Sequence, residues 1–274
     1  MAKKSEAQIE IAPITMGRIT CCLIGYDIIM HRYSKKAREQ LLFPKGRINS
    51  AEKAENLKHD PLGEYRECFY RNRDSSEPAL FHLPTGMFSK ALAAAALDMP
   101  GASKAQILRL ASVTTRQINV FGVPQMFMAM TRSSDMARTP DVRTRPVFPV
   151  AACKIEIEFV SSLLKQNQIV NLLAAAGVIV GIGDWRPQKG GPHGKFRIVD
   201  ANDPEYLRIV KTGGKAAQQA AYEKPVAYDF DTEELYGWFC EEVERRERTL
   251  PSTEDAPPAR AKRNGRGDSE ATAN

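Results

Sequence analysis

The chain has 274 residues, of which 43% are hydrophobic and 26% are charged, and its formal net charge is +6 at pH 7. This composition is typical of a globular protein with a sizeable core, and the positive charge favours a polyanionic partner such as nucleic acid. We expect neither membrane insertion nor secretion, because no stretch reaches the roughly eighteen apolar residues of a span and the N-terminus lacks an apolar signal region.

The five cysteines form no CxxC pair and no metal-binding spacing with histidine. Two of them, Cys21 and Cys22, are adjacent within an apolar run, where alternate side chains point to opposite faces of a strand. Reduced and mostly buried thiols in a cytoplasmic protein explain this usage. We therefore expect no metal site and assign no cofactor.

The expected elements begin with a strand at residues 18–25, which are apolar, rich in β-branched side chains and closed by a glycine. A helix is expected from Ser34, a good N-cap, and its basic cluster is explained equally well by a solvated helix face. An alanine-rich helix spans residues 85–98 after a proline and a glycine. The other expected elements up to residue 130 are a helix around the aromatic residues 65–70, a loop at 71–78, a strand at 79–83, a helix capped by Ser103, and one or two strands in 117–130.

Residues 131–149 contain few apolar side chains, and we expect an insertion there. Residues 150–160 alternate like a strand with one wet face, and a helix at 166–177 ends on a glycine. An apolar run at 178–180 resembles a strand, and a glycine-rich loop then leads to a strand at 194–199. A helix capped by Asp231 closes the expected order. The insertion carries four arginines: Arg132, Arg138, Arg143 and Arg145.

In order, the middle of the chain is strand, helix, strand, strand, helix, strand. This predicts an α+β fold with a ferredoxin-like or RNA-recognition-type βαββαβ core, a thumb-like insertion and a helical insertion. The predicted organisation is a flexible lead-in (1–16), a core (17–200) with insertions at 26–78 and 131–149, a C-terminal helical extension (201–250) and a disordered tail (251–274).

The glycine-rich loop is the strongest local candidate for a binding site. Glycines allow close approach to backbone N–H groups, and the arginine and lysine residues between them supply positive charge, which together favour phosphate. A hairpin with a solvated glycine-rich tip explains the same pattern equally well.

Three segments resemble one family. LFHLPTGMFSKALAAAA (80–96) resembles the Pro-x-Gly helix start with an early lysine found in the repeat-associated mysterious protein (RAMP) superfamily, and GIGDWRPQKGGPHGKFRIV (181–199) resembles its glycine-rich loop. The arginine-rich insertion is similar in position to the thumb hairpin of the CRISPR backbone subunit. The chain departs from these motifs at Thr85, Met87 and Ala91, and Asp184 and Trp185 have no counterpart in the family loop. The resemblance indicates a distant branch, phage- or plasmid-borne.

The resemblance implies sequence-independent binding of the guide RNA backbone by the repeated subunit of a CRISPR-like ribonucleoprotein filament in antiviral defence. Its implied partners are single-stranded guide RNA, a complementary target nucleic acid, further copies of the chain and other effector subunits, with no membrane. Trp185, with Phe121 or Phe127, would stack on splayed bases. The implied RNA-binding residues are His31, Arg32, Lys35, Lys36, Ser89, Lys90, Arg132, Arg138, Arg143, Arg145, Trp185, Arg186, Lys189 and Lys195.

Three other functions remain open at this stage. The chain would also suit a phage single-strand DNA-binding or annealing protein, a RAMP-type endoribonuclease, or a structural phage protein. The sequence shows no nucleophile motif, P-loop or metal cluster, so a non-catalytic RNA-binding scaffold is the favoured interpretation. A lone histidine is more often structural than catalytic. The weak catalytic candidates are His31, His193, Asp135 and Asp141.

Overall fold

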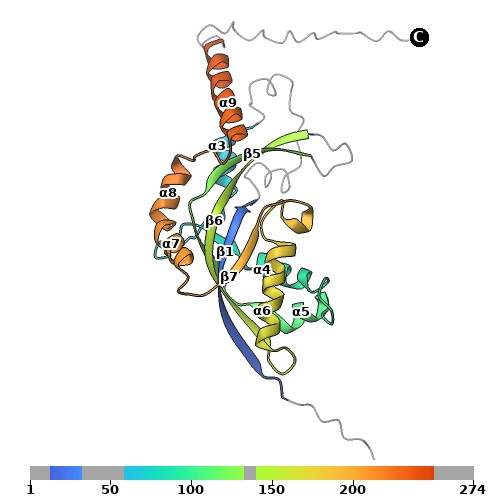
Figure 1. Cartoon of the computed structure of the whole chain (residues 1–274). Coiled ribbons are helices and arrows are strands. Elements are labelled where there is room, and N and C mark those ends of the chain that lie inside the picture. The colour runs from blue at the N-terminus through green and yellow to red at the C-terminus, as the bar shows by residue number, and fades with distance from the viewer. Residues whose placement is uncertain (1–12, 33–58, 133–139, 250–274) are drawn as a thin grey trace, which may run out of the picture. The chain divides into compact units, whose positions relative to one another are not determined.

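The computed structural model describes residues 13–32, 59–132 and 140–249. The fold is α+β, with an open antiparallel sheet and several helices (Figure 1). The chain divides into two compact units, Met1–Glu234 and Leu235–Asn274. The whole sheet and the candidate site described below belong to the first unit.

Strand β6 (Pro140–Val160) is the centre of the sheet. Strand β1 (Met16–Ile29) pairs antiparallel along one of its edges, from Met16 opposite Val160 to Ile29 opposite Val147. The other edge of β6 pairs in succession with β3 (Ala111–Val113), β4 (Gln117–Phe121) and β5 (Gln125–Arg132). The sheet is extended by β2 (His82–Pro84), which pairs with β4, and by β7 (Lys195–Val199), which pairs with β1. The strand order is β2-β4-β6-β1-β7.

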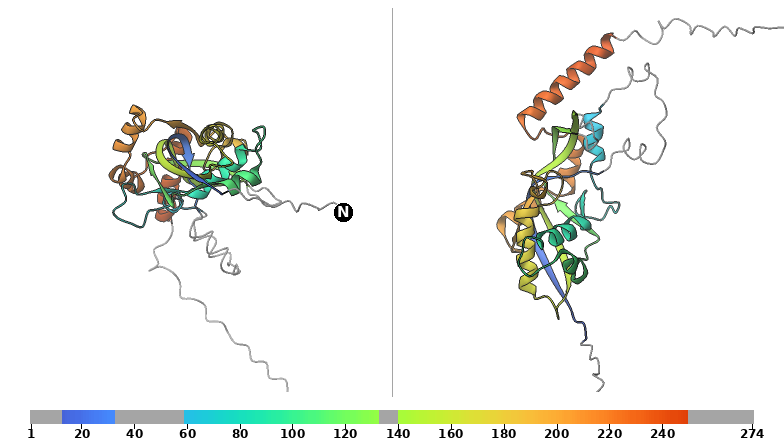
Figure 2. Two further views of the ribbon diagram at one scale, coloured as in Figure 1. Left: turned by 90° about the horizontal axis from the view of Figure 1, so that it is seen from below. Right: turned by 90° about the vertical axis from the view of Figure 1, so that its right-hand side faces the viewer.

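Helices α4 (Thr85–Ala95) and α6 (Gln166–Ala175) cover one face of the sheet, where Phe88 of α4 meets Phe196 of β7 edge to face at 5.7 Å. The views in Figures 1 and 2 place α7 and α8 on the opposite side from α4, α5 and α6. The remaining helical segments are α3 (Pro61–Glu67), α5 (Lys104–Leu110), the π-helical turn η1 (Ala176–Val180), the 3-10 turn η2 (Pro187–Lys189), α7 (Pro204–Thr212), α8 (Lys215–Glu223) and α9 (Phe230–Thr249).

Helix α7 closes the second face of the sheet. Its Tyr206 and Ile209 form one buried cluster with Cys22, Ile24 and Ala152 of the sheet. Burial of side chains of this size contributes about 1.5–3 kcal/mol each. An RNA-recognition domain stacks bases on its open sheet face, and here that face is occupied by the protein itself; Phe121, expected as a stacking residue, packs against this same cluster.

Several expected elements are confirmed. The strand at 18–25 is the middle of β1, the helix at 85–98 is α4, and the strand at 194–199 is β7. Ser103 caps α5, because its Oγ accepts a hydrogen bond from the Gln106 N–H at 3.3 Å. The helix predicted among the aromatic residues is α3, which begins and ends earlier than expected, and the strand predicted at 79–83 is displaced to β2.

Where it is described, the arginine-rich insertion is part of the hairpin of β5 and β6. Residues 140–149 are the first half of β6 and pair with β5 in a hairpin, from Gln125 opposite Val147 to Arg132 opposite Pro140. The prediction of a strand beginning at residue 150 was therefore wrong by ten residues. Three prolines, Pro140, Pro146 and Pro149, hid this part of the strand, because proline is uncommon inside strands.

The apolar run at 178–180 is not a strand. It belongs to η1, which continues α6 through Gly177, so this glycine does not end the helix as predicted. A Cβ at Gly177 would overlap the Phe196 carbonyl, which shows that the glycine is needed for close approach to β7. Gly181, with φ at +70°, ends the helical segment instead.

The cap of α9 (Phe230–Thr249) differs from the prediction. Asp229 rather than Asp231 caps α9, because its Oδ1 accepts a hydrogen bond from the Thr232 N–H at 2.8 Å. All five cysteines lie in the described residues and are free. No helix of the described ranges is long and apolar enough to cross a membrane. The helix expected from Ser34, most of the lead-in and the C-terminal tail lie outside the described residues.

Candidate nucleic-acid interface

The β5–β6 hairpin divides its arginines between two faces. Phe127 lies opposite Arg145 and Ala129 opposite Arg143, and directly paired residues of two strands share a face. Successive side chains of a strand point to opposite faces, and Arg132, opposite Pro140, is an odd number of residues from Phe127 along β5. Its side chain is therefore on the other face. Only one face of the hairpin therefore combines Phe127 with two arginines.

The glycine-rich loop, residues 181–194, packs on that same face. Arg145 of β6 forms an ion pair with Asp184 of the loop, and the Asp184 N–H donates to the Ile29 carbonyl at 3.0 Å. The Arg145 side chain is 4% exposed, and its Nε has no hydrogen-bond partner among the described residues. We call the surface formed by Phe127, Arg143, Arg145 and this loop the loop–hairpin face.

Electrostatics keep Asp184 ionised in this position. Its partial burial favours the neutral acid, but the Arg145 guanidinium and the backbone N–H of Trp185 outweigh that effect, and the pKa of Asp184 is lower than that of a free aspartate. Arg145 is thus neutralised and covered. It is not available for the direct phosphate contact that the sequence suggested, and instead positions the loop.

The loop glycines serve the loop's own packing. Gly183 has φ at +82°, and a Cβ there would lie 2.6 Å from the Ile29 carbonyl oxygen. The N–H groups of Gly181, Gly190, Gly191 and Gly194 all donate to carbonyl groups of the protein. Their expected role as phosphate donors is therefore wrong for these four residues: their hydrogen-bonding capacity is already used.

An aromatic cluster lies beside the ion pair. The Trp185 ring is nearly parallel to that of Phe127, with centroids 6.5 Å apart and planes at 16°, and the His193 ring is 5.1 Å from Trp185. Tyr228 meets Phe127 edge to face at 5.4 Å and donates its hydroxyl to Asp27 Oδ1 at 2.8 Å. Phe127 and His193 are buried, whereas Trp185 is 44% exposed.

The two histidines of this region are held neutral. Burial lowers the pKa of His31, and although Asp184 acts in the opposite direction, Arg145 and Arg143 lower it further. Burial also lowers the pKa of His193. The Nδ1 atom of each ring is buried without a hydrogen-bond partner among the described residues. At pH 7 neither histidine therefore supplies positive charge to a phosphate.

The other predicted residues are distributed as follows. Lys189, Lys195, Arg143 and Arg132 are exposed, whereas Arg186 bonds within the loop to the Gly183 carbonyl and the Gln188 side chain. Ser89 bonds back to the Thr85 carbonyl on α4, where Lys90 is exposed, and Arg32 is half-buried. Lys35, Lys36, Asp135 and Arg138 lie outside the described residues.

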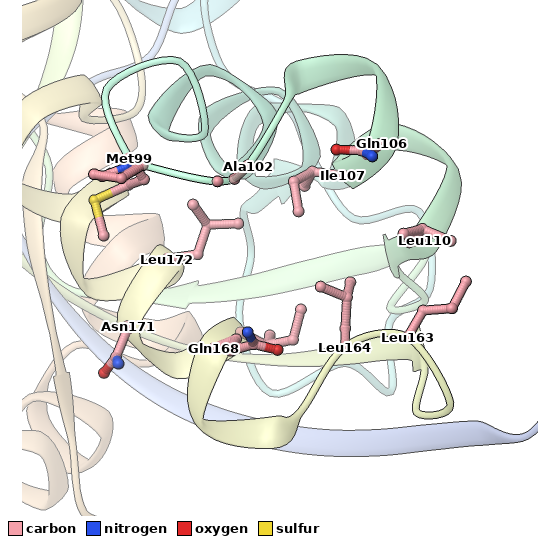
Figure 3. A pocket seen from close by; sticks show the side chains of 13 residues that line it. Met99, Ala102, Gln106, Ile107, Leu110, Leu163, Leu164, Gln168, Asn171 and Leu172 are labelled. Carbon is pink, nitrogen blue, oxygen red and sulfur yellow. The ribbon is translucent and has the colours of Figure 1, made fainter.

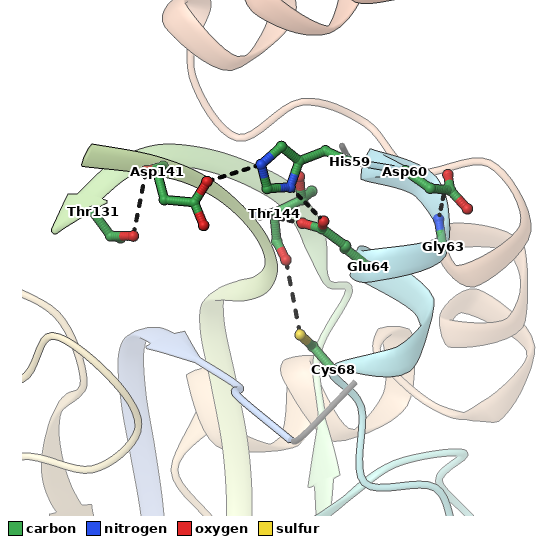
Figure 4. A network of polar contacts seen from close by, with 8 residues as sticks. All are labelled: His59, Asp60, Gly63, Glu64, Cys68, Thr131, Asp141 and Thr144. Atoms are coloured by element: carbon green, nitrogen blue, oxygen red, sulfur yellow. Dashed lines mark hydrogen bonds and ion pairs between the residues drawn. The ribbon is translucent and has the colours of Figure 1, made fainter. Parts of the chain in front are cut away.

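A polar network toward the Arg132–Pro140 end of the hairpin was not predicted. His59 Nδ1 lies 2.8 Å from Glu64 Oε1 and its Nε2 lies 2.9 Å from Asp141 Oδ1, so the ring bridges α3 and β6 (Figure 4). The Thr144 N–H donates to Glu64 Oε2, and the Cys68 thiol to the Thr144 carbonyl. Asp141 is thus engaged in a structural contact, which argues against its predicted role as a catalytic acid.

A groove of about 430 Å³ lies between α5 and α6. Figure 3 shows Ile107, Leu164 and Leu172 pointing toward one another across it, with glutamine and asparagine at its rim. It has no charged side chain in its lining. Its chemistry does not suit a phosphate, so it is not the nucleic-acid site.

The described residues contain no group of three or more His, Cys, Asp or Glu side chains suited to a metal ion. A scan against protein-family models and a search of curated proteins found no match to this chain.

Proposed function

We propose that the chain binds the backbone of single-stranded guide RNA, independently of sequence, as the repeated subunit of a CRISPR-like ribonucleoprotein filament. In this proposal its core is a ferredoxin-like βαββαβ unit formed by β1, α4, β4, β6, α6 and β7. Support comes from the strand order β4-β6-β1-β7, in which every neighbour is antiparallel, with α4 and α6 as the connections.

The Arg145–Asp184 ion pair is the observation that carries the proposal. It joins two segments separated by 39 residues that were each expected to contact RNA, and so forms one surface from them. Exposed Arg143 on the hairpin and exposed Lys189 on the loop belong to these two segments. Because α7 covers the alternative sheet face, the loop–hairpin face is the favoured place for a nucleic acid.

Replacing Arg143 by alanine tests this directly. We expect its affinity for single-stranded RNA to fall about tenfold, to a similar extent for oligo(U) and oligo(A), with a shallower dependence on salt, because one phosphate contact is lost. Fluorescence anisotropy at several salt concentrations measures both quantities.

Arg132→Ala is the matched control, since it removes the same charge from the opposite face of the same hairpin. We expect it to retain most of the affinity. Unchanged binding in Arg143→Ala, or equal losses in the two variants, would contradict assignment of the site to this face.

One observation favours the endoribonuclease alternative. His31 and His193 have lowered pKa values in the neighbourhood of Arg145, and a neutral imidazole can act as a general base. The two functions differ in the fate of the RNA. A binding scaffold leaves it intact after long incubation, whereas a nuclease shortens it.

A further inference from the structure

We propose that Trp185 is a stacking platform for an unpaired nucleobase, held in position from below by Phe127 and from the side by the Asp184–Arg145 pair. This inference rests on the proposed function and adds a base contact to a surface otherwise argued from phosphate contacts. The stack needs no hydrogen bond to a base edge, so it is compatible with binding that ignores sequence.

The exposure of the rings supports a platform. The ring centroids of Phe127 and His193 lie 6.5 and 5.1 Å from that of Trp185 and 5.7 Å from each other, so the three rings form one cluster. Phe127 is 6% exposed and His193 8%, whereas Trp185 remains 44% exposed. The indole is therefore supported by two buried rings and keeps accessible surface on which a further ring can pack.

The backbone at Trp185 is strained. Its φ is +48°, a left-handed conformation that bulky L-residues rarely adopt and that usually belongs to glycine. Such a residue persists where its surroundings fix it, and residues of this kind concentrate at ligand sites.

Four contacts hold this conformation. The preceding residue, Asp184, pairs with buried Arg145 and donates its N–H to Ile29. The Trp185 carbonyl accepts the His193 N–H at 3.3 Å. Gly191 lies so close to Trp185 that a Cβ at 191 would overlap the Trp185 carbonyl. The ring is thus presented in one orientation, and little conformational entropy remains to be lost when a base binds.

The charge around the platform favours a nucleotide over a purely apolar partner. Exposed Arg143 projects from the same hairpin face, and exposed Lys189 belongs to the same loop as Trp185. Proteins bind single strands by stacking bases on aromatic rings and pairing phosphates with basic side chains, and this surface offers both kinds of group.

The chain has two tryptophans, so Trp238→Phe produces a protein whose tryptophan fluorescence reports Trp185 alone. This protein is titrated with oligo(U) and with an abasic oligonucleotide of the same length, which keeps the phosphates and lacks the bases. We expect oligo(U) to quench the fluorescence and the abasic strand to bind more weakly without strong quenching.

In the same background, Trp185→Ala is expected to weaken oligo(U) binding at least tenfold and to leave abasic binding unchanged, while Trp185→Phe retains most of the affinity. Thermal unfolding of each variant confirms that it is folded. Oligo(U) binding that is tight, unquenched and insensitive to Trp185→Ala would overturn the platform and leave the proposed function standing. Absence of binding by every oligonucleotide would overturn both the platform and the proposed function.

Discussion

Replacing Asp184 by alanine is expected to lower the free energy of unfolding by about 2 kcal/mol. The change leaves the Arg145 guanidinium, only 4% exposed, without its counter-charge. Breaking a fully buried pair in this way costs about 3–5 kcal/mol. Because the Asp184 side chain is 44% exposed, water enters readily beside the orphaned charge, and we expect a smaller value. Urea unfolding followed by circular dichroism measures the difference.

The double variant Arg145→Met with Asp184→Ala is the control, since it removes both charges and keeps an apolar side chain of similar length. It should recover more than half of the lost stability. A double variant as unstable as Asp184→Ala would show that the loop depends on something other than this pair.

The same pair predicts a pH dependence. The pKa of Asp184 is lower in the folded protein than the value of about 3.9 in an unfolded chain, so the carboxylate stabilises the fold above about pH 4. This contribution is lost as the pH falls through the folded-state pKa. The stability difference between wild type and Asp184→Ala should therefore shrink as the pH falls below about 4.

The second large effect is expected at Gly194. A Cβ at this position would overlap the Ile182 carbonyl oxygen, and the backbone φ is +77°. Gly194→Ala must therefore displace backbone that is hydrogen-bonded to Tyr26 and Ile182, and we expect a loss of about 3 kcal/mol in the free energy of unfolding. Equilibrium denaturation of the purified variant gives this number.

Gly190 provides a matched comparison within the same loop. Its φ is also +77°, but a Cβ there meets nothing within 4 Å. Gly190→Ala isolates the cost of the backbone conformation and should be limited to about 1 kcal/mol. Similar losses at the two positions would mean that the close approach of Gly194 to Ile182 contributes nothing.

The regular parts of the fold were accessible from local sequence patterns. A β-branched run bounded by glycine marked β1, an alanine-rich segment after Pro-x-Gly marked α4, and Ser103 marked the start of α5. In each of these the residues that determine the element lie within it or next to it. Local propensity and capping are therefore sufficient to identify it.

The parts that were missed depend on distant residues. The first half of β6 is a strand because β5 pairs with it, although it contains three prolines. Residue 177 is a glycine within a helical segment, where the Phe196 carbonyl of β7 leaves no room for a Cβ. The burial of Arg145 depends on a loop 39 residues away. Tyr228 and Asp27, which support the aromatic cluster, are 201 residues apart. No local pattern encodes such contacts.

The glycine-rich loop illustrates the same division. Its composition correctly marked an unusual loop, but glycine is equally suited to approach a phosphate or a neighbouring strand. The amides of Gly181, Gly190, Gly191 and Gly194 donate to carbonyl groups of the protein itself, that of Gly194 to Tyr26 of β1, so the glycines serve packing within the protein. The family resemblance left two residues of this loop unexplained. Of these, Asp184 holds the loop through its ion pair, and Trp185 is exposed beside it.

The most direct test of the proposed function is the affinity of the wild-type protein for single-stranded RNA as a function of salt. We predict binding of similar strength to oligo(U), oligo(A) and a mixed sequence, and much weaker binding to duplex DNA. The logarithm of the affinity should fall linearly with the logarithm of salt concentration, by about 0.7 per phosphate contacted. No binding of single-stranded RNA at low salt, or equally tight binding of duplex DNA, would contradict the proposal.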